Sequence, residues 1–139
     1  MTVLVITDET DVSESIQDLL EFAGHACLVA DDVAKAEWLL QTVRIDAWML
    51  DLGLPGRNPL GWLEEQQRHD PELARRSVVL TDHRLPPQAL RRLEATGARI
   101  LERRCGAGQL RDAIIQRGMP IENRLAGSPP PDTAEGGGI

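Results

Sequence analysis

The sequence predicts an α/β fold in which helices cover both faces of a parallel sheet. Short apolar runs alternate five times with stretches whose apolar residues recur at helical spacing. The runs are continuously apolar rather than alternating with polar residues, which is typical of parallel strands buried on both faces. Because every strand is followed by a helix, we expect a doubly wound, five-stranded parallel sheet.

The predicted strands are the apolar runs themselves. In chain order they cover residues 3–6, 26–30, 45–50, 77–81 and 98–101. The first reads VLVI and the second ACLVA, and the third is interrupted only by Asp46. Each run is short enough to be a strand and lies between polar or glycine-containing segments.

The predicted helices follow these strands one by one. They cover residues 12–23, 32–43, 60–69, 87–96 and 108–117. In the first, Val12, Ile16 and Leu20 lie on one helical face, and Asp11 with Glu14 resembles a capping box at its start. The same spacing of apolar residues predicts the other four.

Length and composition limit the classes of protein to be considered. The 139 residues fit one domain, predicted over residues 1–118, followed over residues 119–139 by a flexible, Pro/Gly-rich tail or linker. A net charge of −7 argues against direct nucleic-acid binding. No apolar run approaches the roughly 20 residues of a membrane span. The two cysteines are no disulfide framework, so a cytoplasmic location is expected.

Polar and charged residues follow four of the five predicted strands. In open α/β sheets, sites form outside the carboxyl ends of the strands, so these residues are expected to lie together. Acids follow three of the strands and arginines follow the last one. The residues are Thr7, Asp8, Glu9, Asp51, Thr81, Asp82, Arg103 and Arg104.

This arrangement, together with the segment DAWMLDLGLPG that contains Asp51, resembles the receiver domain of two-component response regulators. The resemblance covers residues 2–117 and implies a flavodoxin-like, CheY-like sheet with strand order 2-1-3-4-5. It also implies signal transduction rather than catalysis, apart from transfer of a phosphoryl group to the domain's own aspartate.

The resemblance assigns roles to matching positions. Asp51 matches the phosphoacceptor, and Thr81 matches the switch hydroxyl. Asp8, Asp51 and the backbone carbonyl of Gly53 match the ligands of Mg²⁺, with Glu9 as a further candidate ligand. Mg²⁺ suits such a site because it prefers oxygen ligands and neutralises an incoming phosphoryl group.

Several positions depart from the family pattern. Thr7 stands where the first acid is expected. The only lysine, Lys35, lies on the second predicted helix, so Arg104 takes the place of the family's lysine, or Arg103 if the register is shifted by one residue. Asp82 stands where a small residue is usual, and it either repels a phosphoryl group, pairs with an arginine or caps the loop.

Two functions remain open on this basis. The first, which the retained Asp8, Asp51 and Thr81 favour, is a receiver that accepts a phosphoryl group on Asp51, with Mg²⁺, from a histidine kinase or a phosphotransfer protein. The second is a degenerate pseudo-receiver that binds a protein partner independently of phosphorylation, which the departures favour. A flavodoxin-like cofactor binder ranks last because no phosphate-cradling loop follows the first strand.

A basic face is expected on the last elements of the fold. In the family, the surface made by the helix 87–96, the strand 98–101 and the helix 108–117 is where partners or a second copy dock. Here it would favour an acidic downstream partner. The arginines on these elements and the adjoining loops are Arg84, Arg91, Arg92, Arg99, Arg103, Arg104, Arg111 and Arg117.

Overall fold

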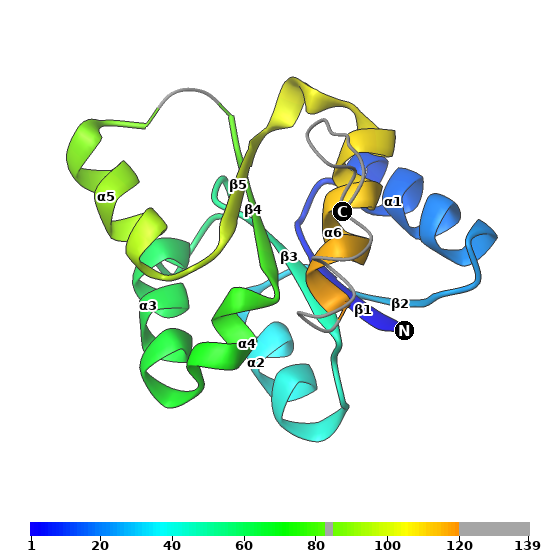
Figure 1. Cartoon of the computed structure of the whole chain (residues 1–139), viewed down its shortest axis with the longest axis horizontal. Helices are drawn as coiled ribbons and strands as arrows, with labels where there is room; N and C mark the ends of the chain where they lie inside the picture. The colour runs from blue at the N-terminus through cyan, green and yellow to red at the C-terminus, as the bar shows by residue number, and fades with distance from the viewer. Residues whose placement is uncertain (83–84, 120–139) are drawn as a thin grey trace, which may run out of the picture.

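A computed structural model of the chain describes residues 1–82 and 85–119 and contains a parallel five-stranded sheet (Figure 1). Its strand order is β2-β1-β3-β4-β5. The predicted fold class, and the strand order that the resemblance implied, are therefore confirmed. The strands are β1 (Thr2–Ile6), β2 (Ala26–Ala30), β3 (Ala47–Asp51), β4 (Ser77–Thr81) and β5 (Arg99–Glu102).

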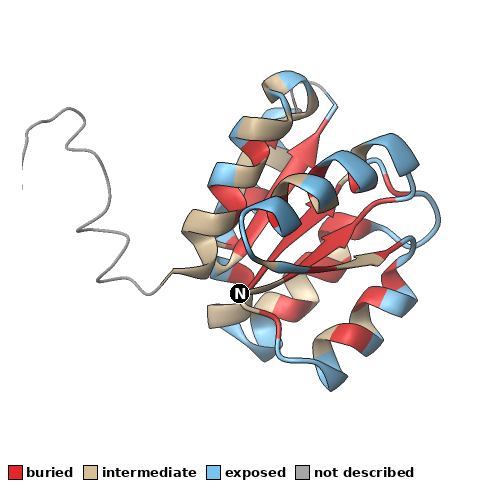
Figure 2. Ribbon diagram, turned by 90° about the vertical axis from the view of Figure 1, so that its right-hand side faces the viewer, coloured by how far each residue is buried: buried red, intermediate tan, exposed pale blue. Residues whose placement is uncertain are grey.

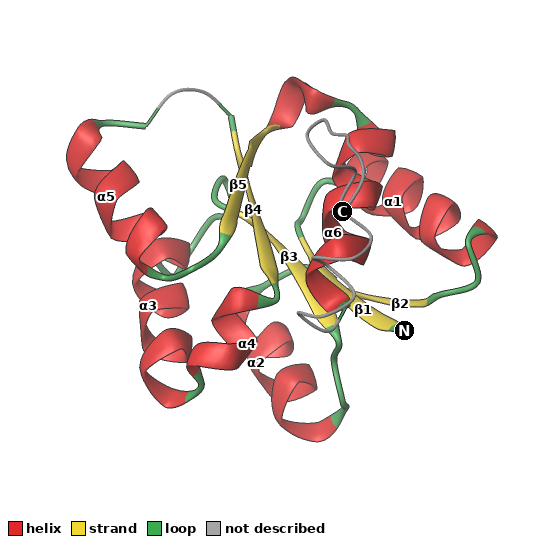
Figure 3. Ribbon diagram, viewed as in Figure 1, coloured by secondary structure: helices red, strands yellow, loops and turns green. Residues whose placement is uncertain are grey.

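Helices lie on both faces of this sheet (Figure 3). Helices α1 and α6 pack side by side on one face, and α2, α3 and α5 cover the other. The helices are α1 (Thr10–Phe22), α2 (Val33–Thr42), α3 (Pro59–His69), α4 (Pro71–Arg75), α5 (Pro87–Ala95) and α6 (Ala107–Gly118), with a 3₁₀ turn η1 (Arg103–Cys105) after β5.

The core consists of two apolar layers separated by the sheet (Figure 2). Successive side chains of β1 alternate between them: Val3 and Val5 pack toward α1 and α6, while Leu4 and Ile6 pack toward α2 and α3. All four are fully buried. A strand buried on both faces explains why its sequence is apolar throughout.

The structure differs from the sequence prediction at two helices. Helix α4 was not predicted, and it begins because Asp70 ends α3 and caps α4 by accepting the N–H of Leu73 at 3.3 Å. Helix α1 begins at Thr10, with Glu9 at the N-cap position, so the capping box of Asp11 and Glu14 was wrong. The chain turns earlier because the hydroxyl of Thr7 accepts the N–H of Glu9.

The predicted tail over residues 119–139 lies outside the described residues, apart from Met119. Among residues 1–82 and 85–119, no helix is both long enough and apolar enough to cross a bilayer.

Candidate functional site

Asp51 lies at the carboxyl edge of the sheet, where the ends of β1, β3 and β4 meet. It is the last residue of β3 and is paired in register with Leu80 of β4. Its exposed fraction is 1 %, and Thr7 after β1 and Thr81 at the end of β4 are buried as well. Because the strands are parallel, their carboxyl ends lie at the same edge of the sheet, and residues that are far apart in sequence converge there.

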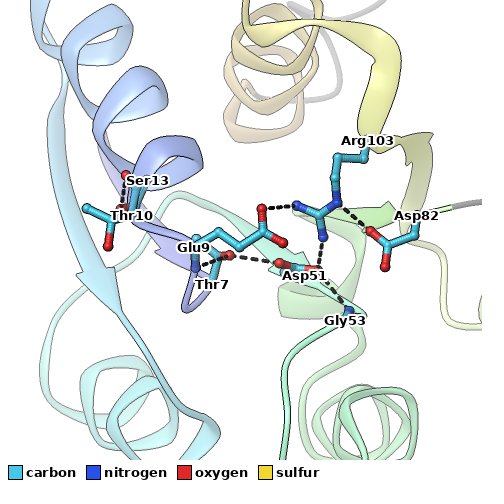
Figure 4. A network of polar contacts seen from close by, with 8 residues as sticks. All are labelled: Thr7, Glu9, Thr10, Ser13, Asp51, Gly53, Asp82 and Arg103. Atoms are coloured by element: carbon cyan, nitrogen blue, oxygen red, sulfur yellow. Dashed lines mark hydrogen bonds and ion pairs between the residues drawn. The ribbon is translucent and has the colours of Figure 1, made fainter.

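Both carboxylate oxygens of Asp51 accept hydrogen bonds (Figure 4). The hydroxyl of Thr7 donates to Oδ2 at 2.7 Å. The backbone N–H of Gly53 donates to Oδ1 at 2.8 Å, and Nη2 of Arg103 donates to the same oxygen at 2.7 Å. These three bonds compensate for the removal of a charged group from water.

Arg103 joins carboxylates from three different parts of the chain. Besides Asp51, its guanidinium donates from Nε to Oδ1 of Asp82, which follows β4. Its Nη1 forms an ion pair with Oε1 of Glu9 at 3.1 Å, without the geometry of a hydrogen bond. Burial opposes the charge on Arg103, but the hydrogen bonds to Asp51 and Asp82 outweigh it and raise the pKa of the guanidinium above its ordinary value.

Arg103, and not Arg104, is the arginine that the structure brings to Asp51. The side chain of Arg104 is 87 % exposed and pairs with Glu102 at 2.8 Å. Strand β5 runs one residue further than expected, to Glu102, and the turn η1 then directs the two arginines to different sides. Of the two arginines that the sequence offered, Arg103 is therefore the one that contacts Asp51.

The other predicted site residues are distributed unevenly. Glu9 and Gly53 lie in the cluster, and Thr81 is beside it at the end of β4. Asp8 is exposed, and among the described residues no hydrogen bond or ion pair connects it to Asp51. The sequence left the role of Asp82 open, and the structure pairs it with Arg103.

A cavity of about 210 Å³ lies beside Gly53 and Thr81, at the same edge of the sheet as Asp51. A Cβ added at Gly53 would lie 3.2 Å from Oδ1 of Asp51 and 3.3 Å from Oδ2 of Asp82, so a side chain would crowd both carboxylates. The cavity has the carboxylate of Asp82 in its wall, whereas Asp51 is not among its lining residues. It is lined by Leu52, Gly53, Thr81, Asp82 and Leu85.

The residues around Asp51 do not fit a Mg²⁺ site. Residues 1–82 and 85–119 contain no group of three or more acidic, histidine or cysteine side chains placed to hold a metal. Thr7 uses its hydroxyl hydrogen on Asp51 and brings no charge. A Mg²⁺ ion at its usual distance of about 2.1 Å from Oδ1 of Asp51 would lie within about 5 Å of the Arg103 guanidinium, which would repel it.

The predicted basic face is partly neutralised by acids of the same chain. Arg103 belongs to the cluster described above, and Arg84 lies outside the described residues. Arg99 donates to the side-chain amide of Gln116 at 3.2 Å. Three ion pairs compensate further arginines: Arg92 with Glu64, Arg104 with Glu102, and Arg111 with Asp112.

Sequence comparisons match nearly all of the described residues to one family. The family model described as the response regulator receiver domain matches residues 3–115. The phosphate regulon transcriptional regulatory protein PhoB of Pseudomonas aeruginosa is 27 % identical to the chain. The match covers 89 % of this chain and 62 % of PhoB, so this chain spans less than two thirds of that relative.

Solved structures agree in fold. A CheY-like response regulator receiver domain protein from Methanospirillum hungatei matches with a TM-score of 0.75 at 17 % identity, over 84 % of this chain and 92 % of that one. An orphan response regulator of H. pylori, HP1043, matches with a TM-score of 0.73 at 17 % identity, over 86 % of this chain and 97 % of that one. At such identities the likeness extends to the fold alone.

Proposed function

The chain belongs to the family of response regulator receiver domains, and from this premise we propose that it acts as a protein-binding module whose state does not depend on phosphorylation of Asp51. The observation that carries this proposal is the engagement of both Asp51 oxygens by Thr7, Gly53 and Arg103. The alternative, a working phosphoacceptor, requires that hydrogen bonds to the Asp51 carboxylate break.

Phosphoryl transfer to an aspartate needs a carboxylate oxygen that can reach the phosphorus in line with the leaving group. Here Oδ1 accepts two hydrogen bonds and Oδ2 accepts one. The carboxylate of Asp82 adds negative charge where an anionic phosphoryl group would arrive. In the part of the chain that the structure describes, no cluster of acidic side chains is placed to hold the Mg²⁺ that receivers typically use to neutralise that charge.

The second candidate remains the receiver that accepts a phosphoryl group from a histidine kinase or a phosphotransfer protein. The position of Thr81 beside Asp51, at a cavity of about 210 Å³, favours it. In that case Arg103 would leave Asp82 and bind the phosphoryl oxygens, as the family's lysine is expected to do. Both candidates share transmission of the signal through protein contacts.

Receiver domains interact with kinases or phosphotransfer proteins, and some form dimers, as the beryllofluoride-activated NtrC4 receiver domain does. For this chain we place the downstream partner, or a second copy, on the face formed by α5, β5 and α6. Arg91 on α5 is exposed and favours an acidic partner there. The ion pairs of Arg92 and Arg104 make this face less basic than the sequence alone predicts.

The experiment that tests the proposal measures the intact mass of the protein after incubation with Mg²⁺ and acetyl phosphate. We expect no phosphoryl adduct on the wild-type chain. An adduct that disappears in Asp51→Asn would overturn the proposal in favour of the phosphoacceptor. A parallel titration with beryllofluoride, followed by amide NMR, is expected to leave the resonances of Asp51 and Thr81 unchanged, and a shift of both would also contradict the proposal.

A further inference from the structure

Arg103 occupies the position between carboxylates that a divalent cation would otherwise hold. Its guanidinium contacts Glu9 from the β1–α1 loop, Asp51 from the end of β3 and Asp82 from the end of β4. Each carboxylate contacts a different nitrogen of the Arg103 guanidinium (Figure 4). The planar guanidinium can do this because its donors point in several fixed directions, whereas an ammonium is a single point charge.

The charged groups at this position lie close together beside Gly53. The site that a Cβ of Gly53 would take lies 3.2 Å from Oδ1 of Asp51, 3.3 Å from Oδ2 of Asp82 and 3.5 Å from Nη2 of Arg103. Two carboxylates and the guanidinium therefore converge at one point. The Arg103 side chain is only 23 % exposed, so water screens these contacts incompletely.

We propose that the guanidinium of Arg103 is the resident cation of this site and takes the place of a divalent metal ion. The inference rests on the proposed function, because a cluster closed by its own cation needs neither a metal ion nor a phosphoryl group to hold its three strand ends together. Three carboxylates, those of Glu9, Asp51 and Asp82, lie against this one cation. Removal of Arg103 leaves these three carboxylates without their cation, and they are then expected to close around a divalent metal ion, for which the described residues of the wild type hold no ready cluster.

The test compares the binding of Mg²⁺ and Mn²⁺ by calorimetry in four proteins: the wild type, Arg103→Met, Arg103→Lys and Arg104→Met. We expect no saturable binding at millimolar metal for the wild type and for Arg104→Met. Arg103→Met is expected to bind at least about tenfold more tightly, because a positive charge within about 5 Å of the metal has been removed. Arg104→Met is the matched control, because it removes a neighbouring arginine that is 87 % exposed and outside the cluster.

Arg103→Lys keeps the charge but cannot bridge three carboxylates at once, so it is expected to bind the metal more tightly than the wild type and less tightly than Arg103→Met, and it provides the test if Arg103→Met does not fold. Binding of Mg²⁺ to the wild type as tight as to Arg103→Lys would overturn the inference. The amide and Arg103 Nε–H resonances of the wild type provide a further readout, and they are expected to stay unchanged on addition of Mg²⁺. Failure of the proposed function appears separately, as a phosphoryl adduct on Asp51, and an adduct formed without Mg²⁺ would leave this inference standing.

Discussion

Asp51 and Asp46 lie at opposite edges of the sheet, and each has an arginine and a backbone N–H as partners. At the amino edge, Asp46 accepts the N–H of Thr2 at 2.9 Å and lies 3.7 Å from Arg44, whose side chain is 91 % exposed. At the carboxyl edge, Asp51 is 1 % exposed and its arginine lies 2.7 Å away. Both pairs join an aspartate to an arginine, but water reaches the pair of Asp46 and Arg44 and hardly reaches the pair of Asp51 and Arg103.

This difference determines how much each edge contributes to stability. Exposed ion pairs are screened and contribute between about 0 and 1 kcal/mol. A buried carboxylate depends on its partners, because the loss of one leaves a charge that water cannot solvate. We therefore expect the carboxyl edge to respond strongly to single substitutions and the amino edge to respond weakly.

The largest effect is expected for Arg103→Met. It leaves Asp51, Asp82 and Glu9 without their shared cation, and the free energy of unfolding should fall by about 2–3 kcal/mol, less than for a fully buried pair because Arg103 is partly exposed. Unfolding in urea measures this change in the free energy of unfolding. Arg104→Met is the control and should change stability by less than about 0.5 kcal/mol. Equal losses in the two variants would show that the cluster carries no special stability.

A smaller effect is expected when the two aspartates themselves are changed. In Asp51→Asn an NH₂ group replaces one oxygen, so either the Thr7 bond or the bonds to Oδ1 are lost, and the charge that attracts Arg103 disappears. The free energy of unfolding should fall by about 1–2 kcal/mol. Asp46→Asn keeps an oxygen for the N–H of Thr2 and should cost less than about 0.5 kcal/mol. An Asp51→Asn variant more stable than the wild type would instead mean that repulsion among the carboxylates dominates.

The smallest effect concerns pH at the amino edge. Burial, followed by the nearby N-terminal ammonium group, lowers the pKa of His25 below its usual value of 6.5. A lowered pKa means that the unfolded chain binds the proton more readily, so this contribution is present above pH 6.5 and is lost as the pH falls. We expect less than about 0.5 kcal/mol, because the site is only partly shielded from water.

The measurement for this edge is the difference in urea midpoint between pH 7.5 and pH 5.5, for the wild type and for His25→Gln. The variant should lose less stability on acidification than the wild type. An equal loss of stability in the two proteins would show that His25 does not contribute to the pH dependence.

The sequence by itself determined the sheet and the position of the candidate site. Continuous apolar runs such as VLVI in β1 are compatible only with burial on both faces, and helical spacing between them requires crossover connections. Asp51 and Thr81 follow from the same pattern, because a polar residue that ends a buried strand must lie at the sheet edge. These conclusions depend on local periodicity, which the sequence displays directly.

Only the tertiary structure decided which arginine meets Asp51 and what Asp82 does. Arg103 and Arg104 are adjacent and chemically identical, and the choice between them depends on where β5 ends and how η1 turns. A shift of one residue reverses the side to which a strand's side chain points, and no local pattern fixes that register at a strand end. The pairing of Asp82 with Arg103 depends likewise on the reach of two side chains from different strands. Such contacts arise from the packing of the whole sheet, and for this reason the state of Asp51 was not evident from the residues that flank it.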